Sequence, residues 1–128
     1  MIEITDRDFR EEVLECESIV IACFVADWCH NCLPLCIVFS ELDKEYNGKV
    51  KFVTIDVEES PDTAVRYRIS AVPTVLIFRD SQPVKRIIGF QDRGYFMDII
   101  NIISVERSTF AKTEDDRTAY ITSVDNTI

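Results

Sequence analysis

The stretch "SIVIACFVADWCHNC", residues 18–32, joins an apolar run directly to a pair of cysteines. The run over residues 18–26 is almost continuously apolar and rich in β-branched side chains, which is typical of a strand buried on both faces. A tryptophan follows, and then Cys29 and Cys32 with two residues between them. We therefore expect a central strand that leads directly into a site of cysteine chemistry.

Apolar spacing and turn-forming residues divide the rest of the chain into helices and strands. The expected helices span residues 6–15, 31–46, 61–67 and 92–107, and the expected strands span residues 2–4, 18–26, 49–57, 73–78 and 84–90. Thr5 and Asp8 form a capping pattern for the first helix, and the polar turn of residues 79–83 joins the last two strands. This order predicts an α/β fold with a central mixed β-sheet of four to five strands flanked by four helices.

Length and composition fit one globular domain. The chain has 128 residues, of which 47% are hydrophobic and 29% charged, as in ordinary folded proteins with one packed core. The apolar periodicity stops near the end of the last expected helix. We therefore expect a domain over residues 1–106 and a polar C-terminal tail, at least partly flexible, over residues 107–128.

Charge and hydropathy disfavour two classes of partner. The net charge is -9, with 14 basic against 23 acidic residues, and the clustered lysines and arginines that neutralise phosphates are absent, so we expect no nucleic-acid partner. No apolar stretch approaches the ~20 residues of a membrane span. The start "MIEITDRDFREE" is acidic, whereas a signal peptide is first basic and then apolar. These features predict a cytoplasmic protein with no membrane partner.

The cysteines are clustered near the start of the chain. They stand at positions 16, 23, 29, 32 and 36. An odd number in a reducing compartment indicates catalytic, metal-binding or merely buried thiols rather than a disulfide scaffold. A metal site made of Cys29, His30, Cys32 and Cys36 is disfavoured, because adjacent side chains at a helix start rarely converge on one tetrahedral ion. We expect no metal ligand.

Cys29 lies where a strand should end and a helix should begin. Unpaired backbone N–H groups and the positive end of the helix dipole favour an anion there, so the pKa of the Cys29 thiol should fall and a thiolate should be available near neutral pH. Cys32, one helical turn further on, is close enough to close a disulfide. The positions predict that Cys29 attacks a substrate disulfide and that Cys32 resolves the mixed disulfide.

Two motifs together resemble the thioredoxin family. The stretch "ADWCHNC", residues 26–32, looks like its Trp-Cys-x-x-Cys site, and "SAVPTVLIF", residues 70–78, looks like its proline-containing loop. The resemblance covers roughly residues 1–106. It implies the thioredoxin fold and a thiol-disulfide oxidoreductase that needs no cofactor. Its partners would be protein disulfide substrates and a thioredoxin-reductase-like or other thiol electron donor.

The same resemblance implies roles for residues around the cysteines. Trp28 would cover the site. Pro73 would have a cis peptide bond, face the cysteines and bar metal from them, while Val72 would offer its backbone to a substrate strand. Gly89 occupies the position of the family's glycine in the last strand. Trp28, Val72, Pro73 and Gly89 are therefore the expected substrate-binding residues.

The chain departs from the family pattern between the two cysteines, where it has His30 and Asn31. A positive charge on His30 beside Cys29 would favour the thiolate, stabilise the reduced form and make the pair a stronger oxidant than thioredoxin. The alternative is that His30 is exposed to solvent, mostly uncharged and without effect on the potential.

A second departure lies behind the cysteines. Cys23 takes the place of a buried acid that is thought to relay a proton to the resolving thiol, and Thr54 takes the place of the acid's lysine partner. Cys36 lies one turn beyond Cys32, so an alternative disulfide among these thiols and a purely hydrophobic role for Cys23 and Cys36 are both open. Cys16 should be structural or unreactive. Because the missing acid puts fast turnover in doubt, the alternative function is a thioredoxin-fold binding module with slow or no redox turnover.

Overall fold

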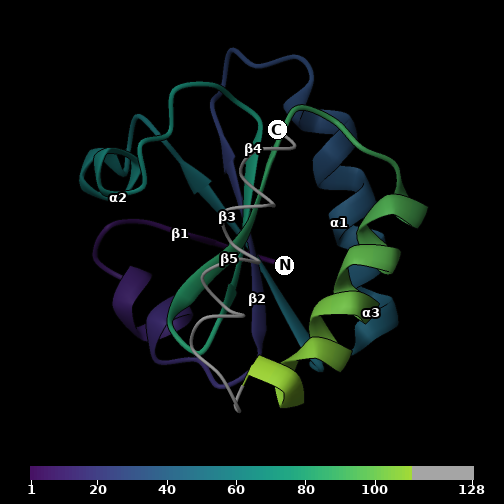
Figure 1. Cartoon of the computed structure of the whole chain (residues 1–128). Helices are drawn as coiled ribbons and strands as arrows, with labels where there is room; N and C mark the ends of the chain where they lie inside the picture. The colour runs from purple at the N-terminus through teal and green to yellow at the C-terminus, as the bar shows by residue number, and fades with distance from the viewer. Residues whose placement is uncertain (111–128) are drawn as a thin grey trace.

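A five-stranded mixed sheet forms the centre of the protein (Figure 1). The computed structural model describes residues 1–110, and the side chains of residues 1–105. The strands are β1 (Ile2–Ile4), β2 (Ile19–Val25), β3 (Val50–Asp56), β4 (Thr74–Arg79) and β5 (Gln82–Ile88). They lie in the order β1-β3-β2-β4-β5; β1, β3 and β2 run parallel, β4 is antiparallel to β2, and β5 is antiparallel to β4. The predicted mixed sheet is confirmed.

Helices cover both faces of this sheet. The helices α1 (Cys32–Tyr46) and α3 (Arg93–Phe110) lie together on one face, and α2 (Pro61–Arg66) and the short helix η1 (Arg10–Leu14) lie on the other, as Figure 1 shows. The predicted α/β layering is therefore confirmed. Within residues 1–110, no helix combines the length and the apolar character that crossing a membrane requires.

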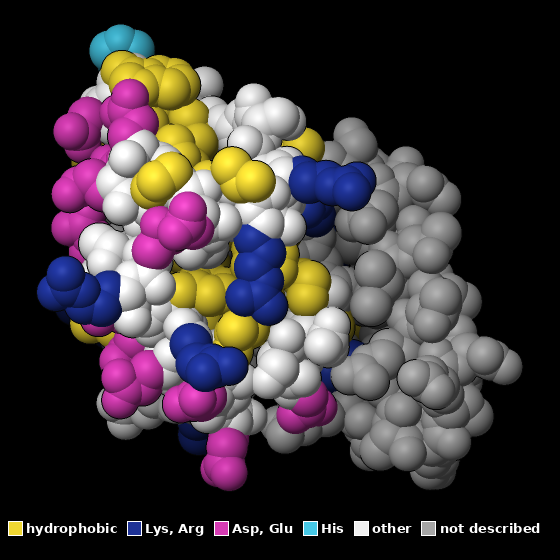
Figure 2. Space-filling view, turned by 90° about the vertical axis from the view of Figure 1, so that its left-hand side faces the viewer, with side chains coloured by type: hydrophobic (Ala, Val, Ile, Leu, Met, Phe, Trp, Pro, Cys, Tyr) yellow, Lys and Arg dark blue, Asp and Glu magenta, His cyan; other side chains and the backbone are white. Residues whose placement is uncertain are grey.

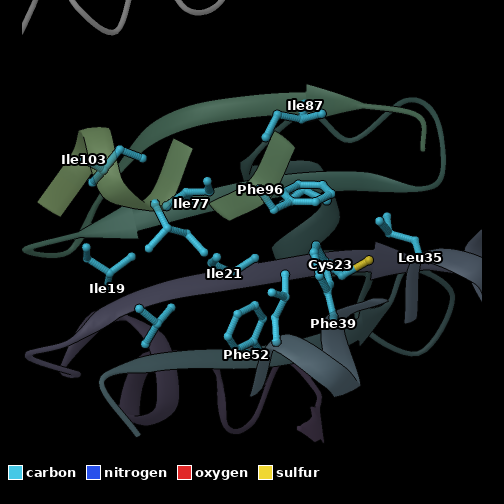
Figure 3. Packing of buried hydrophobic residues seen from close by; sticks show 14 of the residues in the cluster. Ile19, Ile21, Cys23, Leu35, Phe39, Phe52, Ile77, Ile87, Phe96 and Ile103 are labelled. Carbon is cyan, nitrogen blue, oxygen red and sulfur yellow. The ribbon is translucent and has the colours of Figure 1, made fainter. Parts of the chain in front are cut away.

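The central strand β2 is buried on both faces, as its composition predicts. Its alternate side chains enter two apolar clusters, one beneath α1 and α3 and one beneath η1. The first cluster includes Ile19, Ile21 and Cys23 with Leu35, Phe39 and Phe96 (Figure 3). The second includes Val20, Ala22 and Phe24 with Phe9 and Val13. This packing fixes the carboxyl end of β2, from which the cysteine-containing loop departs.

The first helix is shorter than the predicted span of residues 6–15. Only the π-helix η1 forms, in which the N–H of Glu15 donates to the carbonyl of Arg10 at 2.9 Å. Asp6 stays outside the helix because its carboxylate accepts two backbone N–H groups and the hydroxyl of Thr63 at the start of α2. Burial alone would raise the pKa of Asp6, but these hydrogen bonds lower it below its ordinary value. The acidic side chain therefore ties the two helices of this face together.

The hairpin between β4 and β5 is tighter than the predicted five-residue turn, residues 79–83. The turn contains only Asp80 and Ser81, and both have positive φ angles, of 53° and 70°. Two-residue turns of this kind match the twist of paired strands. Pairing therefore continues to the turn itself, where Arg79 lies opposite Gln82.

The boundaries of the other helices also differ by one to three residues from the predicted ones, and α2 ends one residue early, at Arg66. Asn31 is the N-cap of α1, so the helix begins at Cys32 rather than at residue 31. α3 continues to Phe110, past the expected end at residue 107, and neither glycine nor proline occurs there to stop it. The remainder of the predicted tail, residues 111–128, lies outside the described residues.

Candidate active site

Cys29 and Cys32 form a disulfide between the end of β2 and the start of α1. Their Cα atoms are 5.4 Å apart. The N–H of Cys29 donates to the carbonyl of Ala26 at 3.1 Å, and the N–H of Cys32 donates to the carbonyl of Cys29 at 3.3 Å. Successive hydrogen-bonded turns thus hold both cysteines at the strand-to-helix junction that the sequence predicts.

The two cysteines of this pair differ in exposure. Cys29 is half-buried, whereas Cys32 is only 4% exposed. Cys29 also precedes the first turn of α1, where unpaired N–H groups and the helix dipole favour a negative charge. In the reduced state, Cys29 is therefore the thiol that a partner can reach, and Cys32 is the thiol kept behind it.

The proline-containing loop lies at the same end of the sheet. β4 runs antiparallel to β2, with Thr74 opposite Phe24, so Pro73 lies beside the end of β2 from which the cysteine loop departs. The Val72–Pro73 peptide bond is cis, as the resemblance implies. The N–H of Gly89 donates to the carbonyl of Pro73 at 2.9 Å. Gly89 therefore anchors the loop from behind, and its φ of 93° is one that favours glycine.

An open cavity of about 120 Å³ lies between the cysteine loop and the proline loop. It is lined by Trp28, Val57, Ile69, Ser70, Ala71 and Val72. Trp28 is 64% exposed and forms an apolar wall beside the disulfide. The sequence assigned Trp28 and Val72 to this site but not Val57, Ile69 or Ala71. The signal for Ile69 and Ala71 is their position within the four residues that precede the cis proline in "ISAVP".

His30 and Asn31 both face solvent. Figure 2 shows the single histidine standing out from one end of the molecule, next to a group of apolar side chains. Asn31 makes no side-chain capping hydrogen bond to α1. The first helical N–H groups therefore have no side-chain cap from Asn31.

Behind the disulfide, Cys23 of β2 and Cys36 of α1 are hydrogen-bonded through their thiols. Cys23 is fully buried and Cys36 is half-buried, and neither is in a disulfide. The hydrogen bond to Cys36 and then burial raise the pKa of Cys23 well above its ordinary value. The same hydrogen bond lowers the pKa of Cys36 to about 7 despite its partial burial. The two residues are thus a polar pair, of which Cys23 belongs to the apolar cluster beneath α1 and α3.

Other residues singled out in the sequence lie differently. Thr54 is the partner of Cys23 in the sheet register, so a hydroxyl side chain occupies the neighbouring strand position. Cys16 is half-buried against the cluster beneath η1. Among the described residues, no group of three or more His, Cys, Asp or Glu side chains is arranged to hold a metal ion.

The pKa of Cys36 leads to a testable pH dependence. Because the thiolate is the reactive form, alkylation of Cys36 by iodoacetamide should accelerate as the pH rises through about 7. In a Cys23→Ala variant the donor to this thiolate is lost, and the midpoint should move up towards the ~8.5 of an ordinary thiol. Mass spectrometry of residues 27–42, released by cleavage before aspartates, measures the rate.

The matched control for this titration is Cys16→Ser, which removes a free thiol packed against the other cluster. It should leave the midpoint for Cys36 unchanged. The hydrogen bond between the two thiols has no effect on Cys36 if the Cys23→Ala variant titrates at the same pH as the wild-type protein.

Comparison with known proteins agrees with this geometry. Residues 1–102 match the family model described as thioredoxin. The chain belongs to the thioredoxin family. Curated thioredoxins of Staphylococcus aureus strains N315 and COL are 33% identical to it over 101 residues, which is 79% of this chain and 95% of each relative. The match covers the sheet, α1, the cis proline and most of α3.

As a member of the thioredoxin family, the chain has the thioredoxin fold that the sequence predicts. The close cysteine pair at the end of β2 is the arrangement of a thiol-disulfide oxidoreductase. The pair Cys23 and Cys36 lies on the helix and strand that carry this site.

Proposed function

We propose that the protein exchanges electrons with disulfides of other proteins through Cys29 and Cys32. The observation that carries the proposal is the asymmetry of the pair: one disulfide joins a reachable Cys29 to a covered Cys32 at a helix start. The reachable sulfur can bond to a substrate. The covered sulfur is held in place to release that substrate again.

In the reducing direction, the Cys29 thiolate attacks one sulfur of a substrate disulfide. The substrate disulfide breaks, its other sulfur leaves as a thiolate, and a mixed disulfide joins Cys29 to the substrate. Cys32 loses its proton and attacks the Cys29 sulfur. The mixed disulfide breaks, the substrate leaves with both sulfurs reduced, and the Cys29–Cys32 disulfide forms. Two electrons thus pass from the protein to the substrate.

The reduced pair must then be regenerated by a thioredoxin-reductase-like protein or another thiol electron donor. We place this cycle in the cytoplasm, where a reducing poise maintains the dithiol. Nucleic acid and membrane have no part in it. No metal or organic cofactor is needed, because thiol-disulfide exchange transfers the electrons through sulfur alone.

The cavity between Trp28 and Val72 is our proposed binding place for the substrate segment. Its walls are largely apolar, and Trp28 offers an exposed aromatic surface beside the disulfide. An extended segment that contains the substrate cysteine would lie against the backbone at Val72, with Pro73 fixing the course of the loop. In this proposal Gly89 contributes by holding Pro73 rather than by touching the substrate.

We assign His30 a tuning role, because it is next to Cys29 in sequence and faces solvent. A His30→Gly variant removes the side chain whose positive charge would favour the thiolate, so its reduction potential should be lower than that of the wild-type protein. For this two-electron couple, ~30 mV corresponds to about 1.4 kcal/mol, so a partial charge effect is measurable. Equilibration with glutathione buffers measures the potential. The same potential in both proteins would mean that His30 has no effect on it. Asn31→Gly, at the other residue between the cysteines, should be measured beside it, because Asn31 is also a proposed tuning residue.

Insulin reduction by dithiothreitol tests the proposed function. The wild-type protein should precipitate reduced insulin chains much faster than dithiothreitol alone. The second candidate, a binding module with slow or no turnover, predicts the uncatalysed rate. It is favoured by one observation: at the position of the family's buried acid, Cys23 shares its hydrogen bond with Cys36, so no carboxylate from that position serves Cys32.

A further inference from the structure

The thiols of Cys23 and Cys36 meet directly behind the active disulfide. They come from different elements, Cys23 from the buried centre of β2 and Cys36 from the second turn of α1, and a hydrogen bond joins them. Both are free thiols. Two sulfurs in hydrogen-bond contact are placed to become a disulfide when they are oxidised.

Cys36 also follows Cys32 by four residues on α1. Residues four apart lie on the same helical face, with Cβ atoms about 5–6 Å apart. With a rise of 1.5 Å per residue, their Cα atoms are about 6 Å apart, within the range of ~4.4–6.8 Å in which a disulfide can close. This Cβ separation is wider than the ~3.5–4.5 Å of a disulfide, so a transient Cys32–Cys36 bond requires a shift of the first turns of α1. Cys36 is nevertheless the free thiol that lies next to both Cys32 and Cys23.

We propose that Cys23 and Cys36 are a second redox-active dithiol, which takes over the disulfide of Cys29 and Cys32 through Cys36. This inference rests on the proposed function in one respect: Cys29 and Cys32 are the pair that external disulfides oxidise first. It adds a second site, and the protein then holds four exchangeable electrons instead of two.

The transfer is an internal exchange that needs no further oxidant. The Cys36 thiolate attacks the Cys32 sulfur, the Cys29–Cys32 bond breaks, and its electron pair leaves on Cys29 as a thiolate at the helix start. Cys23 then gives up its proton and attacks the Cys36 sulfur. The transient Cys32–Cys36 bond breaks, and Cys32 leaves as a thiolate that takes up a proton. One disulfide is lost and one is formed.

Two features of the structure support this direction of attack. Cys36 is half-buried and readily ionised, so it supplies the attacking thiolate at neutral pH. Cys23 is fully buried, so an external disulfide cannot reach it directly. Oxidation of the inner pair should therefore proceed through the active site. The exchange would leave Cys29 and Cys32 reduced while the oxidising equivalent is stored in the core.

Peptide mapping can detect a disulfide made by Cys23, and a Cys36→Ala variant identifies its partner. Cleavage before aspartates separates residues 8–26, which contain Cys16 and Cys23, from residues 27–42, which contain the other three cysteines. In a Cys16→Ser background, a disulfide that links the two peptides must involve Cys23. A Cys29–Cys32 disulfide stays within one peptide. Free thiols are blocked with N-ethylmaleimide before cleavage so that disulfides do not rearrange.

The experiment follows oxidation of the reduced Cys16→Ser protein by oxidised glutathione. We expect the linked peptides to appear, and to appear at least ten times more slowly when Cys29→Ala and Cys32→Ala are added. The link should vanish in a Cys36→Ala variant. Absence of the link at full oxidation, equal rates with and without the outer pair, or a link that persists without Cys36 would each overturn the proposal.

A second measurement avoids changes at the active site. The Cys16→Ser protein, oxidised to one disulfide and freed of oxidant, is treated with iodoacetamide. We expect a product alkylated at Cys29 and Cys32 and linked between Cys23 and Cys36, whereas alkylation confined to Cys36 contradicts the exchange. Insulin reduction separates the two proposals: catalysis without the inner link rejects only this inference, and the inner link without catalysis rejects only the proposed function.

Discussion

Replacing Cys29 with serine should reduce insulin reduction by dithiothreitol to the uncatalysed rate. The half-buried Cys29 is the sulfur of the pair that a partner can reach, and Cys32 behind it is only 4% exposed. A serine hydroxyl stays protonated at neutral pH and cannot form a mixed disulfide. Loss of the attacking group in a covalent mechanism removes most of the catalysis, so we expect a decrease of at least about 100-fold.

The control for this loss is Cys16→Ser, because Cys16 is half-buried against the cluster on the opposite face of the sheet. It should reduce insulin at the wild-type rate. A Cys29→Ser protein that keeps most of the wild-type rate would transfer the role of nucleophile to another thiol, and Cys36 would be the first to test.

Leu35→Ala should give a large loss of stability. Leu35 belongs to α1 and is fully buried, in the cluster that also contains Cys23 and Phe39. Truncation of a buried leucine removes apolar contacts and leaves a cavity, which costs about 2–5 kcal/mol. A domain of this size has a free energy of unfolding of about 5–15 kcal/mol, so the loss should be evident as a lower urea midpoint.

The chain offers a matched control for this variant two residues away. Leu33 belongs to the same helix but is 67% exposed, so Leu33→Ala should change the free energy of unfolding by no more than about 0.5 kcal/mol. Comparable losses in both variants would mean that α1 is not packed through the face that carries Leu35. The positions of Cys32 and Cys36 would then need revision, because both depend on that packing.

The elements that the sequence predicts best are those whose pattern has a single physical explanation. The apolar run over residues 18–26, rich in β-branched side chains, is typical of a strand buried on both faces, and β2 is that strand. The cysteine pair followed from its position at a strand-to-helix junction, and the cis proline was implied by the resemblance of "SAVPTVLIF" to the proline-containing loop of the thioredoxin family. Each of these predictions depended on neighbouring residues in the sequence.

The features that the sequence did not predict depend on contacts between distant residues. Asp6 has the pattern of a helix residue, yet its carboxylate binds the start of α2 at Thr63, which no local pattern reveals. The strand ends at Arg79 and Gln82 depend on the backbone angles of a two-residue turn. The cavity beside Trp28 forms only when the cysteine loop and the proline loop come together at one end of the sheet.

The thiol pair shows the same limit at the site itself. The sequence placed Cys23 and Cys36 near the resolving cysteine, since one lies on the buried strand and the other a turn further along the helix. It left open whether these thiols form an alternative disulfide or are small buried hydrophobic residues. Through the hydrogen bond between them, each thiol shifts the pKa of the other. No local sequence pattern predicts this bond, because it depends on how α1 lies over β2.

Trapping of a mixed disulfide by a Cys32→Ser variant tests the central claim most directly. This variant retains the attacking Cys29 but lacks the thiol that releases the substrate. Incubated with insulin and analysed without reductant, the variant should accumulate a covalent adduct that dithiothreitol cleaves by reduction. The adduct should be absent from a Cys29→Ser/Cys32→Ser control. An absent adduct, or one that forms equally in the control, would contradict the claim that Cys29 exchanges with protein disulfides.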